Sequence, residues 1–273
     1  MDWNEDFLRK SLTGKLIGHK LYYFPQTGST NDDAFRLGME GLPEGTVVLA
    51  DSQTKGKGRM ARVWHSPAGF NIYTSLILRP NLKPADAPQI SLVAGVAVAE
   101  LLKQHCSGRV ELKWPNDVLV TGRKICGILA QMKTAGENVD FVVVGIGVNV
   151  NIPQNQFPEE ILDTAVSLSS DAGREINRHD LIISLYENFA KWYRKLLQNG
   201  FAAIKERWLD LAPMIGQDIQ IMLQNEKIIG KALDLADDGS LILLTPDNKR
   251  LKISAGDATI LNRGMQPLVP RGE

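Results

Sequence analysis

The chain has 273 residues, and its 31 basic and 31 acidic side chains give a formal net charge of zero. This balance argues against a global electrostatic field that would draw the chain to nucleic acid or to a membrane. A hydrophobic content of 44% with 23% charged residues is typical of a globular protein large enough for one main core and a small second domain.

Cysteine usage and the N-terminus indicate the compartment. The two cysteines, Cys106 and Cys126, are too few for a disulfide framework or a thiolate metal site. The first six residues are acidic and do not resemble a signal peptide, and no stretch reads as a membrane span. The sequence therefore predicts a cytoplasmic protein with no membrane partner.

The first predicted elements are a short helix over residues 4–12, a strand over residues 21–24 and a helix that ends near Met39. Ser29 with Asp32 three residues later is typical of a capping box at the start of that second helix. Ser29, Thr30 and Asn31 would then serve only as capping residues. Alternatively, the free N–H groups of the helix N-terminus would bind the polar head of a ligand.

A strand over residues 46–51 leads into a basic loop, which we define as residues 55–64. It contains Lys55, Lys57, Arg59 and Arg62 and no acidic residue. Two glycines between these cations allow close approach of the backbone to a ligand, so the loop is typical of a lid that orders over phosphate.

The basic loop allows two other interpretations. It also fits a solvated loop or a nucleic-acid patch, which is the commonest role of such a cluster. The spacing Gly56-x-Gly58-x-x-Ala61 formally fits a dinucleotide fingerprint, but no helix starts after it, which excludes that interpretation.

The middle of the chain alternates strand and helix patterns. A strand is expected over residues 72–78, an almost wholly apolar and therefore buried helix over 91–103, and a hairpin over 110–132. Lys113, Asp117 and Lys124 lie in this hairpin, and three ionisable groups so close together indicate either a site or a solvated surface hairpin.

A core strand is predicted over residues 141–150. Gly145 and Gly147 lie inside it, which indicates close approach by a ligand or another backbone, or else a bulge. Asn149 and Asn151 would share a face of this strand, because side chains alternate with period two.

Two amphipathic helices, over residues 180–199 and 201–211, precede a change of composition at Pro213. Four short strand patterns then follow at even spacing, which predicts a small β-barrel: 218–223, 227–235, 240–244 and 250–253. Residues 268–272 resemble an engineered protease-cleavage site, so the tail 264–273 is excluded from the fold prediction.

Taken together, five sequence blocks resemble the biotin–protein ligases. They occur in the family order: 28–31 (Gly-Ser-Thr-Asn), Gln53 with 56–64 (Gly-Lys-Gly-Arg-Met-Ala-Arg-Val-Trp), 113–117 (Lys-Trp-Pro-Asn-Asp), 122–129 (Gly-Arg-Lys-Ile-Cys-Gly-Ile-Leu) and 145–149 (Gly-Ile-Gly-Val-Asn). They cover about 120 residues, and five blocks in order are more specific than any one alone.

The resemblance implies an α+β fold: a mixed sheet flanked by helices, of the class II synthetase-like type, followed by a small SH3-like barrel. The implied domains are a catalytic domain at 1–213 and a barrel at 214–263. The implied reaction joins biotin and ATP into biotinoyl-5′-AMP and then transfers biotin to a lysine of a biotin carboxyl carrier protein. A lipoate–protein ligase of the same fold is the alternative.

The resemblance also implies roles for individual residues. Lys124 and Arg59 would be catalytic, and Asp117 would bind Mg²⁺. The biotin-binding residues would be Ser29, Thr30, Asn31, Gln53, Gly56, Lys57, Gly58, Arg59, Lys124 and Gly127. The ATP and adenylate contacts would be Arg59, Arg62, Trp64, Asn116, Lys124 and Asn149.

Two positions depart from the family pattern of the basic loop. Lys57 stands where an arginine is usual, so a bidentate fork becomes a point charge. Ala61 stands where a glycine is usual, which restricts the backbone there.

Partners follow from the same resemblance. Only some 25 residues precede the first block, too few for the DNA-binding domain of bifunctional family members, so no nucleic-acid partner and no repressor function are expected. The family resemblance allows a homodimer, which nothing in the sequence decides.

Overall fold

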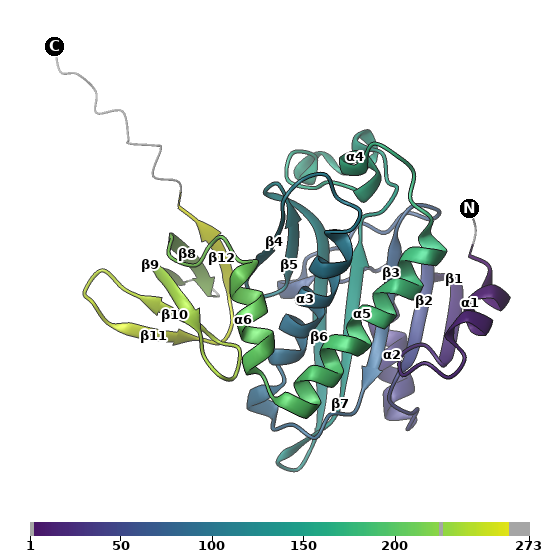
Figure 1. Ribbon diagram of the computed structural model, residues 1–273, viewed down its shortest axis with the longest axis horizontal. Helices are drawn as coiled ribbons and strands as arrows, with labels where there is room; N and C mark the ends of the chain where they lie inside the picture. The colour runs from purple at the N-terminus through teal and green to yellow at the C-terminus, as the bar shows by residue number, and fades with distance from the viewer. Residues whose placement is uncertain (1–2, 224–225, 262–273) are drawn as a thin grey trace.

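The computed structural model describes residues 3–223 and 226–261. The predicted tail, 264–273, and the last two residues of the predicted barrel domain lie outside these ranges. Figure 1 shows a larger part, in which helices cover a sheet, and a smaller part that contains only strands.

Among the described residues, the larger part is built on a seven-stranded mixed sheet with the order β1-β2-β3-β7-β6-β5-β4. β1 and β2 are parallel, and the other neighbours are antiparallel. The strands are β1 (Lys20–Thr27), β2 (Thr46–Gln53), β3 (Ile72–Leu78), β4 (Val110–Lys113), β5 (Asp117–Val120), β6 (Arg123–Ala135) and β7 (Asn138–Val148).

Helices cover both faces of this sheet (Figure 1). On one face α2 (Thr30–Met39) packs Ala34 and Leu37 against Phe141 of β7. The other face is covered by the helices drawn in front of the sheet: α1 (Glu5–Leu12), α3 (Gln89–Leu102), α5 (Arg178–Asn199) and α6 (Ala202–Asp210). A short helix, α4 (Leu168–Ala172), lies in the loops at one end of the sheet.

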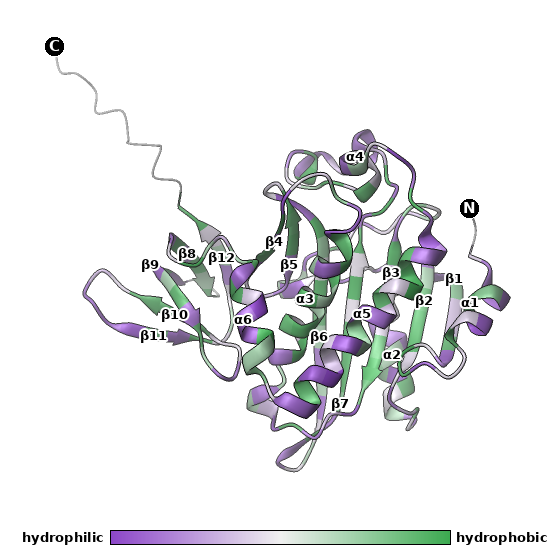
Figure 2. Ribbon diagram, viewed as in Figure 1, coloured by the Kyte–Doolittle hydropathy of each residue, from purple (hydrophilic) through white to green (hydrophobic). Residues whose placement is uncertain are grey.

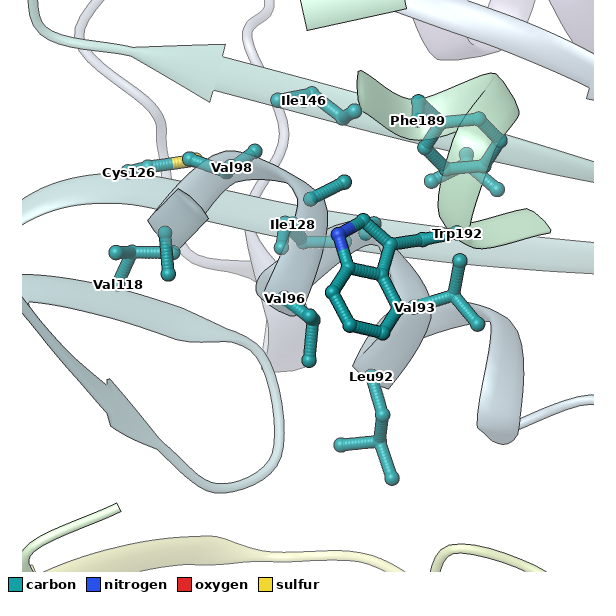
Figure 3. Close-up of a cluster of buried hydrophobic side chains, with 14 of the residues drawn as sticks. Leu92, Val93, Val96, Val98, Val118, Cys126, Ile128, Ile146, Phe189 and Trp192 are labelled. Atoms are coloured by element: carbon teal, nitrogen blue, oxygen red, sulfur yellow. The ribbon is translucent and has the colours of Figure 1, made fainter. Parts of the chain in front are cut away.

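The main core lies between the sheet and the layer of α3 and α5. Figure 3 shows Val93 and Val96 of α3 beside Trp192 of α5 and Ile128 of β6. α5 has an apolar face toward this core and a polar outer face (Figure 2), as expected for a helix that covers a sheet.

The stretch Pro84–Leu102, which includes α3, has the length and composition of a membrane span, so the expectation that no stretch would reach that length is wrong. However, 72% of the most apolar segment of this stretch is buried inside the protein. Because α3 is enclosed by α5, α6 and the sheet, its apolar composition is that of a core helix.

The smaller part is a five-stranded antiparallel sheet with the order β11-β10-β9-β8-β12. Its described strands are β8 (Asp218–Leu223), β9 (Glu226–Leu235), β10 (Leu241–Leu244), β11 (Arg250–Ile253) and β12 (Asp257–Ile260). The predicted combination of a helix-flanked mixed sheet with a small C-terminal β unit is confirmed.

Most predicted elements lie within a few residues of the observed ones. The short helix α4 and the strand β12 were not predicted; β12 is only four residues long, and three residues separate it from β11. β7 ends at Val148, so Asn149 and Asn151 do not share a strand face. Ser29 is the N-cap residue of α2, but its side chain makes no capping hydrogen bond, so the predicted capping box is wrong.

Candidate active site

A cavity of about 560 Å³ opens between the mixed sheet and the C-terminal sheet. It brings together fourteen of the fifteen residues that the sequence predicted for a site: Ser29, Thr30, Asn31, Gln53, Lys57, Gly58, Arg59, Arg62, Trp64, Asn116, Asp117, Lys124, Gly127 and Asn149. Gly56 is the exception. A Cβ there would lie 2.3 Å from the carbonyl oxygen of Trp64, so Gly56 allows that backbone to approach rather than lining the cavity.

The basic loop folds as a small hairpin along one side of the cavity. The N–H of Gly58 donates to Arg62 O at 2.7 Å, and the N–H of Trp64 donates to Gly56 O at 2.9 Å. At the tip, Met60 and Ala61 have φ of 54° and 59°. The left-handed region disfavours side chains, and Ala61 is the position where the family pattern has glycine, so this alanine carries local backbone strain.

Lys57 connects the basic loop to the start of α2. Its Nζ lies 2.6 Å from Asp32 Oδ1, and both side chains are about half exposed. An exposed ion pair of this kind contributes little to stability. Lys57 therefore remains available to an anionic ligand in the cavity.

The two arginines of the basic loop are held by the C-terminal sheet. Arg59 Nη1 donates to Gly256 O at 3.1 Å and lies 3.5 Å from Asp257 Oδ1, while Arg62 pairs with Asp257 Oδ2. Burial lowers the pKa of the Arg59 guanidinium, and the carboxylates of Asp257 and Asp117 oppose that change. A single carboxylate of β12 thus holds two cations at the mouth of the cavity.

Lys124 is the cation at the centre of the site. Its Nζ lies 2.6 Å from Asp117 Oδ1 on the adjacent strand β5, and 5.5 Å from the centre of the Trp64 ring. The lysine side chain is 34% exposed and the aspartate 16%, so the ammonium group keeps access to the cavity. Of the two sequence interpretations of this hairpin, the one that expected a site agrees with this geometry.

The Trp64 indole lies in a slot over two glycines of the sheet. A Cβ at Gly127 would be 2.9 Å from Trp64 Cζ3, and a Cβ at Gly147 would be 2.5 Å from Trp64 Nε1. The buried Nε1 has no hydrogen-bond partner among the described residues. These glycines therefore give the aromatic ring access to the sheet surface, whereas the resemblance implied that Gly127 is a biotin-binding residue.

Polar side chains line the opposite end of the cavity. The N–H of Thr30 donates to Gln53 Oε1 at 2.9 Å, which ties the first turn of α2 to the end of β2. Ser29, Thr30 and Asn31 are all nearly fully buried. Buried polar groups of this kind need partners, so this end of the cavity is suited to a ligand with its own donors and acceptors.

Two further predicted asparagines, Asn116 and Asn149, help to shape the cavity wall. Asn116 Oδ1 accepts from Arg59 Nη1 at 3.3 Å, and its Nδ2 donates to Ile128 O at 2.8 Å. Asn149 Nδ2 donates to Val166 O at 3.3 Å. Asn151 instead binds the backbone of Ile176 and takes no part in the site.

The donor set for a metal ion is small. Among the described residues no group of three His, Cys, Asp or Glu side chains is arranged to hold a metal. Asp117 Oδ1 is buried and forms an ion pair with Lys124 Nζ at 2.6 Å. A single carboxylate that is already paired fits Mg²⁺ only where phosphate oxygens supply most of the other ligands.

Two residues that shape the site were not predicted as site residues from the sequence. Asp257 lies in the unpredicted strand β12, far along the chain from the basic loop. The sequence predicted that another group lies close to Gly147, but it did not show that this group is the Trp64 side chain. A carboxylate near the C-terminal end of a small β domain carries no motif that would have identified Asp257.

Comparison with known proteins identifies the family. Residues 23–149 match the model of the biotin/lipoate A/B protein ligase family, and residues 214–260 match the biotin protein ligase C-terminal domain. The bifunctional ligase/repressor BirA of Bacillus subtilis is 40% identical over 252 residues, which cover 92% of this chain and 78% of that protein. A biotin–acetyl-CoA-carboxylase ligase of Paracoccus denitrificans is 35% identical over 83% of this chain and 95% of its own length.

Solved structures agree with these sequence relatives. The biotin protein ligase of Aquifex aeolicus, solved in complex with biotin and ATP, superposes with a TM-score of 0.74 and 29% identity over 89% of this chain and 98% of that chain. Fold, site geometry and sequence relatives therefore agree, and the chain belongs to the biotin protein ligase family.

Proposed function

We propose that this chain is an ATP-dependent ligase that activates biotin as biotinoyl-5′-AMP and transfers it to a lysine of a carboxylase carrier protein. The observation that carries the proposal is the set of side chains that line one cavity. This cavity is lined by the polar residues Thr30 and Gln53, by the cations Lys124 and Arg59, and by the Trp64 ring, whose centre lies 5.5 Å from Lys124 Nζ.

In the first step a biotin carboxylate oxygen forms a bond to the α-phosphorus of ATP, and the bond from that phosphorus to the leaving pyrophosphate breaks. Two anions must meet, so fixed positive charge is needed to offset their repulsion and the charge of the transition state. Lys124 is placed for this role, because its ammonium group lies at the cavity centre beside a single carboxylate. Arg59 and Arg62 supply further charge from the basic loop.

In the second step the neutral amine of the acceptor lysine attacks the acyl carbon, the bond to AMP breaks, and the amine loses a proton as the amide forms. The mixed anhydride hydrolyses if water reaches it. The basic loop, held against Asp257, covers the mouth of the cavity and is the element suited to exclude water.

We further propose that Mg²⁺ enters with the phosphates of ATP and meets Asp117 as its single protein carboxylate. The support is the place of Asp117, a largely buried carboxylate of the cavity wall that pairs with Lys124, the cation proposed to meet the phosphates. A bound Mg²⁺ would neutralise charge on the phosphates. The homodimer stays a prediction from the resemblance, and the cytoplasmic location stays a prediction from the cysteine usage and the N-terminus.

A direct assay tests the main proposal. The protein is incubated with ATP, Mg²⁺ and labelled biotin, with and without a carrier domain that has its acceptor lysine. Labelled adenylate without the carrier, and labelled carrier when it is added, are expected. A carrier with arginine in place of the lysine should remain unlabelled, and failure to form adenylate would contradict the proposal.

Lipoate in place of biotin tests the alternative substrate. A dithiolane ring has no hydrogen-bond donors or acceptors to match Thr30 and Gln53, and a site built for a polar head rejects an analogue without one. Labelling should therefore be much weaker with lipoate. Equal labelling with both acids would favour the broader lipoate-ligase function.

A further inference from the structure

A serine below the cavity connects the polar residues that line it. Ser75 lies on β3, is fully buried and is not among the lining residues. Its Oγ lies 2.7 Å from Asn31 Oδ1 and 2.8 Å from Thr30 Oγ1. It therefore contacts two consecutive residues of the first turn of α2 from beneath.

The amide of Asn31 can adopt only one orientation. Its Nδ2 lies 3.1 Å from Leu129 O and 3.0 Å from Gln131 Oε1, and a carbonyl oxygen only accepts. The Oδ1 atom must therefore face Ser75, which donates to it. Gly145 makes this arrangement possible, because a Cβ there would lie 1.9 Å from Asn31 Oδ1.

The amide of Gln53 is fixed in the same way. Its Oε1 accepts from the N–H of Thr30 at 2.9 Å, and its Nε2 donates to Ser66 Oγ at 2.9 Å. The Ser66 hydroxyl gives its own proton to Trp64 O at 2.9 Å, so it can only accept from Gln53. Reversal of the Gln53 amide would place two donors against each other at Thr30.

The Thr30 hydroxyl consequently donates its proton to another protein group and not to a ligand in the cavity. Its two nearby acceptors are Gln53 Oε1, at 3.2 Å, and Ser75 Oγ, at 2.8 Å. With either acceptor, Thr30 Oγ1 keeps a lone pair for the cavity. Gln53 Nε2 carries two protons, and among the described residues only Ser66 is a partner for one of them.

The polar end of the cavity therefore presents an acceptor at Thr30 beside a donor at Gln53. A ligand head with an N–H next to a carbonyl, as in a cyclic urea, matches this pair. A head with acceptors alone leaves the Thr30 lone pair opposite another lone pair, which is unfavourable in a buried site.

We propose that Ser75 is a positioning residue that maintains the donor and acceptor pattern of this end by holding Asn31 and Thr30 together. This inference rests on the proposed function, because it concerns recognition of the ureido head of biotin. Ser75 acts through Thr30 and need not touch the ligand. The loss of its hydroxyl leaves Asn31 Oδ1 without its donor, and it leaves the Thr30 hydroxyl held only by its longer contact with Gln53 Oε1, at 3.2 Å.

The variant Ser75→Ala tests the proposal in a steady-state adenylation assay. The KM for biotin should rise about tenfold, while kcat and the KM for ATP stay within about twofold, because an interaction that orients the ground state is lost. Discrimination between biotin and a biotin methylated on a ureido nitrogen should shrink by a similar factor.

Ser52→Ala is the matched control. Ser52 is a buried serine of β2 whose hydroxyl donates to Pro25 O at 3.2 Å, and it does not line the cavity. It should leave the KM for biotin and the discrimination unchanged. Equal changes in Ser52→Ala and Ser75→Ala, or unchanged discrimination in Ser75→Ala, would overturn the proposal.

A second variant covers the case in which Ser75→Ala does not fold. Gln131→Met removes a partly exposed acceptor of Asn31, and it should change the same two quantities in the same direction by a smaller factor. If Gln131→Met leaves both quantities unchanged, the proposal fails. The wild-type protein is assayed in parallel, so absence of any adenylate would count against the proposed function instead.

Discussion

Lys124 Nζ lies 2.6 Å from Asp117 Oδ1, so the lysine on which the site is centred is held by a carboxylate of the next strand. The two strands pair antiparallel with Asp117 opposite Gly127 and Lys124 opposite Leu119, so the lysine side chain reaches diagonally to the carboxylate. The ion pair positions the ammonium group while leaving one third of the lysine side chain exposed to the cavity. An incoming carboxylate or phosphate can therefore share Lys124 with Asp117.

Lys124→Ala should reduce biotin-dependent exchange of pyrophosphate into ATP by about 100-fold to 1,000-fold, the usual effect of removing one group that stabilises transition-state charge. Lys205→Ala is the control, because Lys205 forms a similar ion pair with Asp234, at 2.8 Å, away from the cavity. Near-normal exchange in Lys124→Ala would remove this lysine from the mechanism.

Asp257→Ala should loosen the basic loop. Asp257 is the carboxylate that pairs with both Arg59 and Arg62, so its removal leaves the loop tied to the C-terminal sheet by one bond to Gly256 O. Trypsin should then cleave after Arg59 or Arg62 several times faster, as followed by mass spectrometry.

The control for this experiment is Asp247→Ala. Asp247 pairs with Lys249 in an exposed turn of the same sheet, and its removal should not change cleavage of the basic loop. If Asp257→Ala and Asp247→Ala are cleaved at the same rate, the contact with β12 does not restrain the loop.

Gly147→Ala should displace the Trp64 indole, since the new Cβ would lie 2.5 Å from Nε1. We expect a loss of about 1–3 kcal/mol in the free energy of unfolding, as for other overpacked sites, together with weaker adenylate binding. Denaturant unfolding and ligand titration measure the two effects.

Gly95→Ala provides the comparison for Gly147→Ala. Gly95 lies inside α3, and a Cβ there would be 3.5 Å from Leu112 Cδ2, an ordinary contact. This variant should be neutral or gain about 0.5–1 kcal/mol from the better helix propensity of alanine. A neutral Gly147→Ala would show that the indole does not need its slot.

His179 should make stability depend on pH. The N–H of Asn4 donates to His179 Nε2 at 2.7 Å, which requires a neutral ring, and burial, followed by the charge of Arg178, lowers the His179 pKa from its ordinary 6.5. The unfolded chain then binds a proton more readily than the folded one. This contribution to stability is full above pH 6.5 and is lost as the pH falls through the lower folded pKa.

The variant His179→Gln should flatten the slope of the free energy of unfolding with pH below pH 6.5, where the unfolded chain takes up a proton that the folded chain does not. The slope should not vanish, because burial also lowers the pKa of His105. Hydrogen exchange separates the two histidines: only His179→Gln should speed exchange of the amides in α1. An unchanged slope in His179→Gln would contradict the prediction.

Hydrophobic periodicity was sufficient to predict most elements of the fold. The apolar stretch in α3, the alternation in β3 and β7 and the even turns of the C-terminal part are local patterns, and local patterns determine which face of an element can be buried. The motif residues were predicted for the same reason, since a loop such as Gly-Lys-Gly-Arg carries its chemistry within a few neighbouring positions.

The sequence by itself thus determined the family, the order of most elements and the motif residues that line the cavity. Only the tertiary structure decided which of these residues meet: Asp257 with Arg62, Trp64 with Gly147, and Ser75 with Asn31. These partners are distant in the chain, and their contacts depend on strand order and on the docking of the C-terminal sheet. No short pattern encodes such pairs, because they form only when separate elements pack together.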